Sequence, residues 1–298
     1  MSQPFQKSFV PASPPLVPVT SPEYGDKIDL STLLYRYLLQ VQGGRLHPEH
    51  VPMNSMESVL DVGCGTGEWV FDLAKRYPKL RIYGLDASDG ALHQAKVRRN
   101  ISSLRGVELR HMDLSLQTLP VPDTFVDFIH MQRFARYVKP QAWPKLIREC
   151  VRVLRPNGWL NIVELEVCEI SSPACITIYR SLLKARARLG RTLDESGSTL
   201  GVAQRLYAML HEVGLYEVGY DVFTVDLGAM GGSTAHTFLS EMVRRAFIAK
   251  PLVVQQGVLE SEEFDRLAEQ ACVEIQSPDL CGWAMLLSAY GRYGGEKE

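Results

Sequence analysis

The sequence predicts an α/β fold with a seven-stranded, mostly parallel sheet and helices on both faces. Two patterns carry this prediction. Short β-branched and apolar segments alternate with helical segments between residues 58 and 165, and a glycine-rich turn joins the first of these strands to the helix after it. Strands that alternate with helices at this spacing form βαβ units, which build a parallel sheet. Ligands of such sheets bind beyond the carboxyl ends of the strands.

The composition is that of a globular protein and disfavours several classes of function. Of 298 residues, 46% are hydrophobic and 22% are charged, which is close to the average. The 32 basic residues stand against 34 acidic ones, so no dedicated nucleic-acid-binding surface is expected. No apolar run reaches the roughly 18–20 residues of a membrane helix, and no leader peptide is visible. Six cysteines without a C-x-x-C pair suit a reduced compartment, and we expect a cytoplasmic protein.

The N-terminal part is predicted to be an extended arm followed by a helix. Six of the 17 prolines fall within residues 1–22, and proline fixes φ and lacks an amide donor. From Leu30 to Val41 the apolar residues follow the period of one helix face, and Gly43 and Gly44 end the pattern. Because this face needs an apolar surface to cover, we expect residues 23–57 to form a helical lid over the binding site.

Five strands and three helices are predicted in the next part of the chain. The strands are 58–62, 80–86, 107–110, 125–130 and 159–165. The helices are one through Trp69 and Ala74, 91–100 and 143–154. Pro78 stops the first helix, and a Pro-Asn-Gly turn at 156–158 closes the third.

The C-terminal half is predicted to complete the sheet and to carry a helical insert. It adds helices at 173–190 and 198–213 and strands at 216–227 and 282–290. The insert, 229–279, lies before the last strand, and Ser261 is the expected N-cap of its second helix. The core is therefore expected to comprise 58–228 together with 280–293.

The turn Gly63-Cys64-Gly65-Thr66-Gly67 is the clearest functional motif. Its glycines let a ligand approach bare backbone at the start of a helix. A dinucleotide site needs G-x-G-x-x-G to seat a pyrophosphate, and here the third glycine comes one residue early. Asp61, just before the turn, repels a pyrophosphate but can accept a hydrogen bond from an ammonium group. These features point to S-adenosylmethionine, although for the turn alone a ligand-free reading stays open.

Two further acids follow the ends of predicted strands. Asp86 ends the second strand, where a carboxylate can hold both hydroxyls of a ribose. Asp113 ends the third strand, where an acid can accept from an adenine amine. A single aspartate at such a place is commonly a cap or turn residue. Three acids after three successive strands, with glycines at the first, favour a nucleoside-containing ligand.

Together these segments resemble the class I S-adenosylmethionine-dependent methyltransferases. The matching segments are VLDVGCGTG (59–67), YGLDAS (83–88), HMD (111–113), FVDFIH (125–130) and LRPNGWL (154–160). GTGEW (65–69), RPNGW (155–159) and the leading helix that ends in Gly43 and Gly44 are similar to a subgroup from secondary metabolism, which includes small-molecule methyltransferases and fungal global regulators.

The resemblance implies a Rossmann-like sheet of order 3-2-1-4-5-7-6 with an antiparallel last strand. It also implies a set of positions that bind S-adenosylmethionine. These are Asp61, Gly63, Cys64, Gly65, Gly67, Asp86, Ala87, Met112, Asp113, Leu114, Met131 and Gln132.

Candidates for substrate contact lie around the expected mouth of the pocket. They are Tyr24, Arg133, Phe134, Tyr137, Glu164, Tyr179, Arg186 and His236. Most have a structural alternative: Tyr24 can be a surface tyrosine, Arg133 a surface charge, and Glu164 a carboxylate that bonds loop amides. Arg186 falls inside the apolar arc of its helix, where snorkelling to solvent is the alternative.

The histidines do not suggest a metal site, because none of the seven shows H-x-x-x-H spacing. Metal-dependent enzymes with this fold carry an Asp-Asn pair among their ligands, and this pair is absent near the fifth strand, although Asn161, Glu164 and Glu166 lie there. His130 is expected to be a hydrogen-bonded core residue, and His236 is a weak candidate for a general base.

We therefore expect metal-independent methyl transfer to a small apolar or aromatic acceptor, in a pocket capped by the insert and the N-terminal segment. The acceptor atom stays open among O, N, S and C. Two alternatives are a regulatory protein that acts through protein partners and an enzyme that holds the cofactor while steering a cyclisation. No nucleic-acid or membrane partner is expected, and a homo-oligomer can form through the N-terminal segment or the insert.

Overall fold

The computed structural model describes residues 30–102, 104–112, 118–135 and 137–294. The expected arm at 1–22 lies outside these residues, as do Tyr24, Asp113 and Leu114. Among the described residues, no helix combines the length and apolar character needed to cross a membrane.

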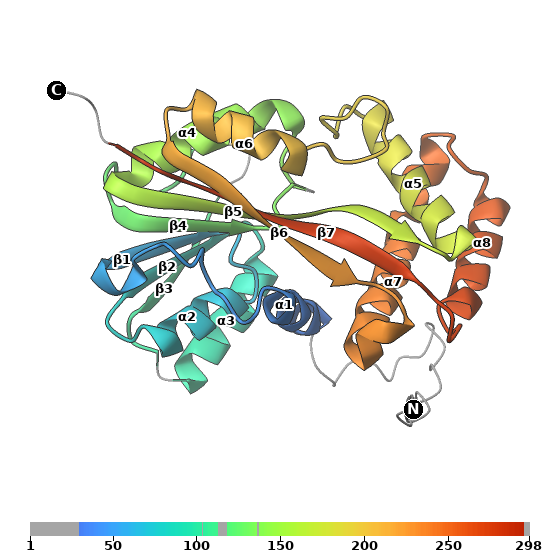
Figure 1. Cartoon of the computed structure of the whole chain (residues 1–298), viewed down its shortest axis with the longest axis horizontal. Coiled ribbons are helices and arrows are strands. Elements are labelled where there is room, and N and C mark those ends of the chain that lie inside the picture. The colour runs from blue at the N-terminus through green and yellow to red at the C-terminus, as the bar shows by residue number, and fades with distance from the viewer. Residues whose placement is uncertain (1–29, 103, 113–117, 136, 295–298) are drawn as a thin grey trace, which may run out of the picture.

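A single sheet of order β3-β2-β1-β4-β5-β7-β6 runs through the molecule (Figure 1). Its strands are β1 Ser58–Val62, β2 Arg81–Asp86, β3 Val107–His111, β4 Val126–Gln132, β5 Leu154–Ile170, β6 Tyr216–Asp226 and β7 Gly282–Arg292. The pairs from β3 to β5 are parallel, whereas β7 runs antiparallel to both of its neighbours. The expected strand order and the antiparallel last strand are confirmed.

Helices cover both faces of the sheet and gather again beyond one end of it (Figure 1). They are α1 Leu30–Val41, α2 Glu68–Arg76, α3 Asp89–Ile101, α4 Trp143–Val153, α5 Pro173–Arg188, α6 Ala203–Glu212, α7 Gly232–Gln255 and α8 Ser261–Glu274. One apolar core joins the sheet to α4 and α6, and a second joins it to α2 and α3. A third core packs α5, α7 and α8 together.

β1 shows why strands in the middle of the sheet carry apolar side chains on both faces. All five of its residues are buried. Val59 packs in the core with α2 and α3, while Leu60 and Val62 pack in the core with α4 and α6. Successive side chains of a strand point to opposite faces, so a parallel strand that is covered on both sides must be apolar on both.

β5 is longer than its sequence pattern predicts, because tertiary pairing extends it. We expected 159–165, whereas the strand runs from Leu154 to Ile170. Its pairing with β4 stops at Val163, opposite Gln132, but its pairing with β7 continues to Ile170. The carboxyl half of β5 therefore projects past the rest of the parallel sheet, toward the insert (Figure 1).

Two other predicted boundaries are wrong for local reasons. α6 was expected from residue 198 but begins at Ala203, because the Asp194 carboxylate accepts the amides of Ser198 and Thr199 and holds them in a turn. Ser261 is the first helical residue of α8 and not its N-cap. The N-cap is Glu260, which has extended backbone angles and makes no capping hydrogen bond through its side chain.

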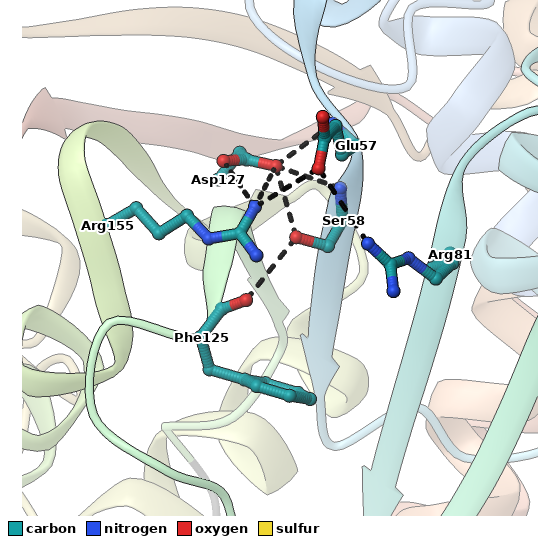
Figure 2. Close-up of polar contacts among 6 residues, drawn as sticks. All are labelled: Glu57, Ser58, Arg81, Phe125, Asp127 and Arg155. Atoms are coloured by element: carbon teal, nitrogen blue, oxygen red, sulfur yellow. Dashed lines mark hydrogen bonds and ion pairs between the residues drawn. The ribbon is translucent and has the colours of Figure 1, made fainter.

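A polar cluster fastens the amino ends of β1 and β4 at the edge of the sheet opposite the site described below (Figure 2). Asp127 Oδ2 accepts the backbone amides of Glu57 and Ser58, both at 2.9 Å, and the Ser58 hydroxyl at 3.0 Å. Arg155 Nη1 donates to Asp127 Oδ1 at 3.1 Å. Burial opposes ionisation, but the donated hydrogen bonds outweigh it and hold the pKa of Asp127 below its usual value.

Asp127→Asn should lower the free energy of unfolding at pH 7 by about 1–2 kcal/mol, because charge-assisted hydrogen bonds become neutral ones. A lowered pKa in the folded state adds stability above the unfolded pKa of about 3.9. That stability disappears as the pH falls through the folded-state pKa. Urea unfolding at pH 7 and pH 4 should therefore show a smaller difference from wild type at the lower pH. Asp279→Asn, at an exposed position, is the control and should change little at either pH.

Candidate functional site

A cavity of about 460 Å³ lies at the carboxyl ends of β1, β2 and β4, the edge at which parallel α/β sheets bind ligands. Most of the predicted cofactor-binding residues line it, namely Asp61, Gly63, Cys64, Gly65, Asp86, Ala87, Met112 and Gln132. Of the predicted substrate residues, Arg133, Phe134 and Tyr137 line the same cavity. Gly67 and Met131 are not among its lining residues.

The positions of Gly67 and Met131 follow from their elements. Gly67 is the N-cap of α2 at φ +86°, and the space beside its Cα is filled by the Phe71 ring. The Met131 side chain is fully buried in the core with α4 and α6. Its neighbours in the strand, His130 and Gln132, point to the other face and line the cavity.

The glycine turn leaves bare backbone facing the cavity. Gly63, Gly65 and Gly67 have φ of +83°, +54° and +86°, a region that side chains adopt at a cost. A Cβ on Gly65 would meet no atom within 4 Å, whereas one on Gly63 would lie 2.7 Å from the Phe134 ring. The space over Gly65 is thus available to a ligand, and Gly63 fixes the distance between the turn and the loop after β4.

Asp86 connects this turn to the end of β2. Its Oδ2 accepts the Gly65 amide and its Oδ1 accepts the Ser88 amide, both at 2.8 Å. The side chain is half-buried and lines the cavity. A carboxylate has about four lone-pair sites, so Asp86 can accept further hydrogen bonds from hydroxyls of a ligand.

Asp61 is a buried acid that is surrounded by other acids. Its side chain is 3% exposed and lines the cavity. Burial, the Asp86 carboxylate and the Glu68 carboxylate raise its pKa well above the usual value. None of the hydrogen bonds among the described residues ends on its carboxylate. A buried acid without a cation is costly, so this arrangement fits a ligand that brings an ammonium group.

Glu68 and His130 line the cavity although they were not predicted to bind a ligand. Glu68 accepts the hydroxyls of Thr32 at 2.7 Å and Thr66 at 2.6 Å, and it pairs with Arg98. Its place in the first turn of α2, directly after the glycines, is the signal that could have identified it.

His130 is a buried core residue, as expected, but its ring also forms part of the cavity wall. The imidazole stacks on Trp69 with ring centroids 4.1 Å apart, and its Nδ1 lies 3.3 Å from Asn161 Oδ1. Burial lowers its pKa to about 3, so the ring is neutral at physiological pH. Sequence alone could not bring Trp69 and His130 together, because they come from α2 and β4.

A second cavity, of about 350 Å³, lies beside the projecting half of β5. Its lining is mostly apolar and comes mainly from β5, α5 and α7, with Leu34 from α1 and Ala284 from β7. Two predicted substrate residues, Tyr179 and Arg186, line this cavity and not the first one. His236, on α7, lines neither cavity.

Glu164 lies at the point on β5 where pairing with β4 has ended. Its Oε1 accepts the backbone amides of Phe134 at 2.6 Å and Ala135 at 2.8 Å. The side chain is 3% exposed. The geometry therefore matches the structural alternative, in which Glu164 bonds the amides of the loop after β4.

α1 lies against both cavities. Leu34 lines the second cavity, while the next residue, Tyr35, lines the first. Polar contacts fix the helix in place: Thr32 donates to Glu68, and the Tyr37 hydroxyl donates to the Asp226 carbonyl at 2.5 Å. Among the described residues, no group of three His, Cys, Asp or Glu side chains is arranged to hold a metal ion.

The chain is similar in sequence to known methyltransferases. Residues 59–158 match the model of a methyltransferase domain family. Methyltransferase cpsF of Aspergillus campestris is 25% identical over 203 residues, which make up 66% of this chain and 69% of that protein. The secondary metabolism regulator laeA of Aspergillus fumisynnematus is 31% identical over 141 residues, 47% of this chain but 34% of the regulator.

Among solved structures, a phosphoethanolamine N-methyltransferase 2 of Haemonchus contortus, in complex with phosphomonomethylethanolamine and S-adenosylhomocysteine, matches at 15% identity. The match covers 88% of this chain and 53% of that one, with a TM-score of 0.49.

Gly65→Ala should abolish binding of S-adenosylhomocysteine or weaken it at least tenfold, because the new methyl group enters the open space over the turn. Gly44→Ala is a matched control, since Gly44 has φ +75° and equally open surroundings but does not line the cavity. Both variants should lose roughly 1 kcal/mol of stability to backbone strain. Calorimetric affinity that is equal in the two variants would contradict the placement of the ligand at Gly65.

Asp61→Asn should stabilise the ligand-free protein and lower its affinity for the ligand. The folded state raises the pKa of Asp61, so stability is lost as the pH rises from about 3.9 toward the folded-state value. The variant lacks this loss. Its gain in free energy of unfolding should grow with pH over that window. Thermal melts between pH 4.5 and 8 measure the gain, and calorimetry with S-adenosylhomocysteine should show at least tenfold weaker binding.

Proposed function

We propose that this chain, which carries a class I S-adenosylmethionine-dependent methyltransferase domain, transfers a methyl group to a small apolar or aromatic acceptor without a metal ion. The observation that carries the proposal is the cavity in which an open glycine turn, the buried Asp61 and the half-buried Asp86 come together. These groups match the amino-acid end and the ribose of the cofactor.

Four residues of the first cavity have a role in this proposal. Asp61 accepts from the ammonium group, and Asp86 accepts from the ribose hydroxyls. Ala87 and Met112 contribute apolar surface at the ends of β2 and β3, beside the nucleoside. When bound, S-adenosylmethionine supplies a methyl group on a positively charged sulfur.

The second cavity is the proposed acceptor site. Pockets of several hundred Å³ with mainly apolar walls are typical of small-molecule sites, and this one shares the wall formed by α1 with the first cavity. Its apolar lining selects an apolar or aromatic acceptor and excludes water. In methyl transfer the protein mainly orients the acceptor toward the methyl group. A base is needed only when the acceptor atom carries a proton, and we assign none.

The proposal is tested by the release of S-adenosylhomocysteine together with an acceptor whose mass rises by one CH2. Purified protein is incubated with S-adenosylmethionine and extracts of natural products, with and without EDTA, and the products are analysed by mass spectrometry. Equal turnover in EDTA is the expected result. A product formed without a change in mass would favour a cyclisation, and turnover that requires magnesium would contradict the metal-free proposal.

A regulatory function is the second candidate, and the similarity to laeA supports it. The aligned segment is about one third of that regulator, so it concerns the domain and not the whole protein. A regulator of this kind would bind S-adenosylmethionine and a protein partner, and variants that fill the second cavity would leave partner binding intact. An acceptor enzyme would lose turnover in the same variants.

Ile178→Trp should abolish turnover while leaving S-adenosylhomocysteine affinity within twofold of wild type, because Ile178 is 3% exposed and lines the second cavity alone. Lys184→Trp, on the exposed side of the same helix, is the control. A melting temperature and a calorimetric titration establish that each variant is folded. Full activity in Ile178→Trp would show that the acceptor binds elsewhere.

A further inference from the structure

The first cavity is lined by charged side chains of both signs, and the acidic ones are in excess. Among the described lining residues, Asp61, Glu68 and Asp86 are acidic, and Arg133 is the one with a permanent positive charge. Glu68 already pairs with Arg98 outside the cavity lining. The wall formed by β1 and β2 is therefore acidic, and the cation lies just after the end of β4.

Arg133 also has an unusual backbone conformation. Its φ is +54°, and residues other than glycine adopt the left-handed region at a cost of roughly 1 kcal/mol or more. The conformation is held from both sides: the Arg133 amide donates to the Val163 carbonyl at 2.8 Å, and Glu164 binds the next two amides. Backbone strain that is enforced by surrounding contacts is concentrated at functional sites.

The acidic wall and the strained arginine define a bipolar site. We propose that Arg133 binds the carboxylate at the amino-acid end of S-adenosylmethionine, at the strand end next to that of Asp61, and that Glu164 is the positioning residue that fixes the Arg133 turn. An α-amino acid carries one positive and one negative group, and the cavity offers one partner for each. A guanidinium matches a carboxylate in charge and in geometry. Arg133 lines the first cavity and not the second, so its partner is the cofactor and not the acceptor. This inference rests on the proposed function.

Two ligands distinguish a contact between Arg133 and the carboxylate from a contribution of Arg133 to binding of the whole cofactor. S-adenosylhomocysteine carries the carboxylate, and its decarboxylated analogue, with an aminopropyl chain on sulfur, lacks it. In calorimetry, wild type should bind S-adenosylhomocysteine at least tenfold more tightly than the analogue. Arg133→Met should lower the affinity for S-adenosylhomocysteine at least tenfold and leave the affinity for the analogue within twofold of wild type. The preference for the ligand with the carboxylate would then disappear. Arg133→Lys should keep part of it.

Backbone variants test the strain independently of the charge. Arg133→Gly relieves the positive φ and removes the guanidinium, so the melting temperature should not fall while the preference for the carboxylate is lost. Thr124→Gly is the matched control, because Thr124 has φ +47°, is exposed, and precedes β4 at the opposite end of the strand. It should not lower the melting temperature either, and it should leave both affinities unchanged.

Glu164 variants test the positioning role. Glu164→Gln keeps an oxygen for the two loop amides and should retain most of the preference, whereas Glu164→Leu should lose it. An unchanged preference in Glu164→Leu would remove the positioning role.

The outcomes distinguish this inference from the proposed function. Equal loss of affinity for both ligands in Arg133→Met, or no loss for either, would overturn the carboxylate role but not the proposed function, because the wild-type protein would still bind the cofactor product. A wild-type protein that binds neither ligand would overturn the proposed function, and the role of Arg133 with it.

Discussion

The turn from β1 into α2 is the constraint on which the rest of the site depends. The amides of Gly63 and Cys64 both donate to the Leu85 carbonyl, at 2.7 and 2.9 Å, and the Gly65 amide donates to Asp86. The turn is thereby tied to the end of β2. Because a Cβ on Gly63 would collide with the Phe134 ring, the loop after β4 can approach only a glycine there. Three strand ends are thus held around one open space by hydrogen bonds and by the absence of a side chain.

The charges in that space oppose folding and favour a ligand. Asp61 is buried beside two other acids, and its pKa is raised as a result. Arg133 is held in a strained conformation at the neighbouring strand end. Such features lower stability and persist only when surrounding contacts enforce them. The backbone pairing of β1 with β2 and β4 enforces the burial of Asp61, and Glu164 enforces the backbone conformation of Arg133. The far edge of the sheet shows the opposite situation, since every donor around Asp127 strengthens the fold (Figure 2).

The additions to the parallel core build the second cavity. Beyond Val163, β5 has lost β4 as a neighbour and pairs with β7 alone. This projecting ribbon carries Leu165, Cys168 and Ile170 to a wall of the cavity, and α5 and α7 supply the others. α1 closes the arrangement, because it presents Leu34 to this cavity and Tyr35 to the first. A small displacement of α1 would therefore alter both cavities at once.

The sequence by itself determined the order of elements and the glycine turn. Short apolar segments, period-3.6 patterns, a glycine-rich turn and acids at strand ends are local properties of the chain, and the strands and most helices lie where these patterns predict. The strand order came from the family resemblance carried by the same motifs.

Only the tertiary structure decided which side chains meet. Whether Met131 or its neighbours face the cavity depends on the register of β4 against β1. The stacking of Trp69 on His130 joins residues 61 positions apart in the chain. The length of β5, the left-handed Arg133 and the role of Glu164 likewise depend on partners distant in sequence. Backbone pairing and burial are fixed by contacts between remote segments, so no local pattern in the sequence records them.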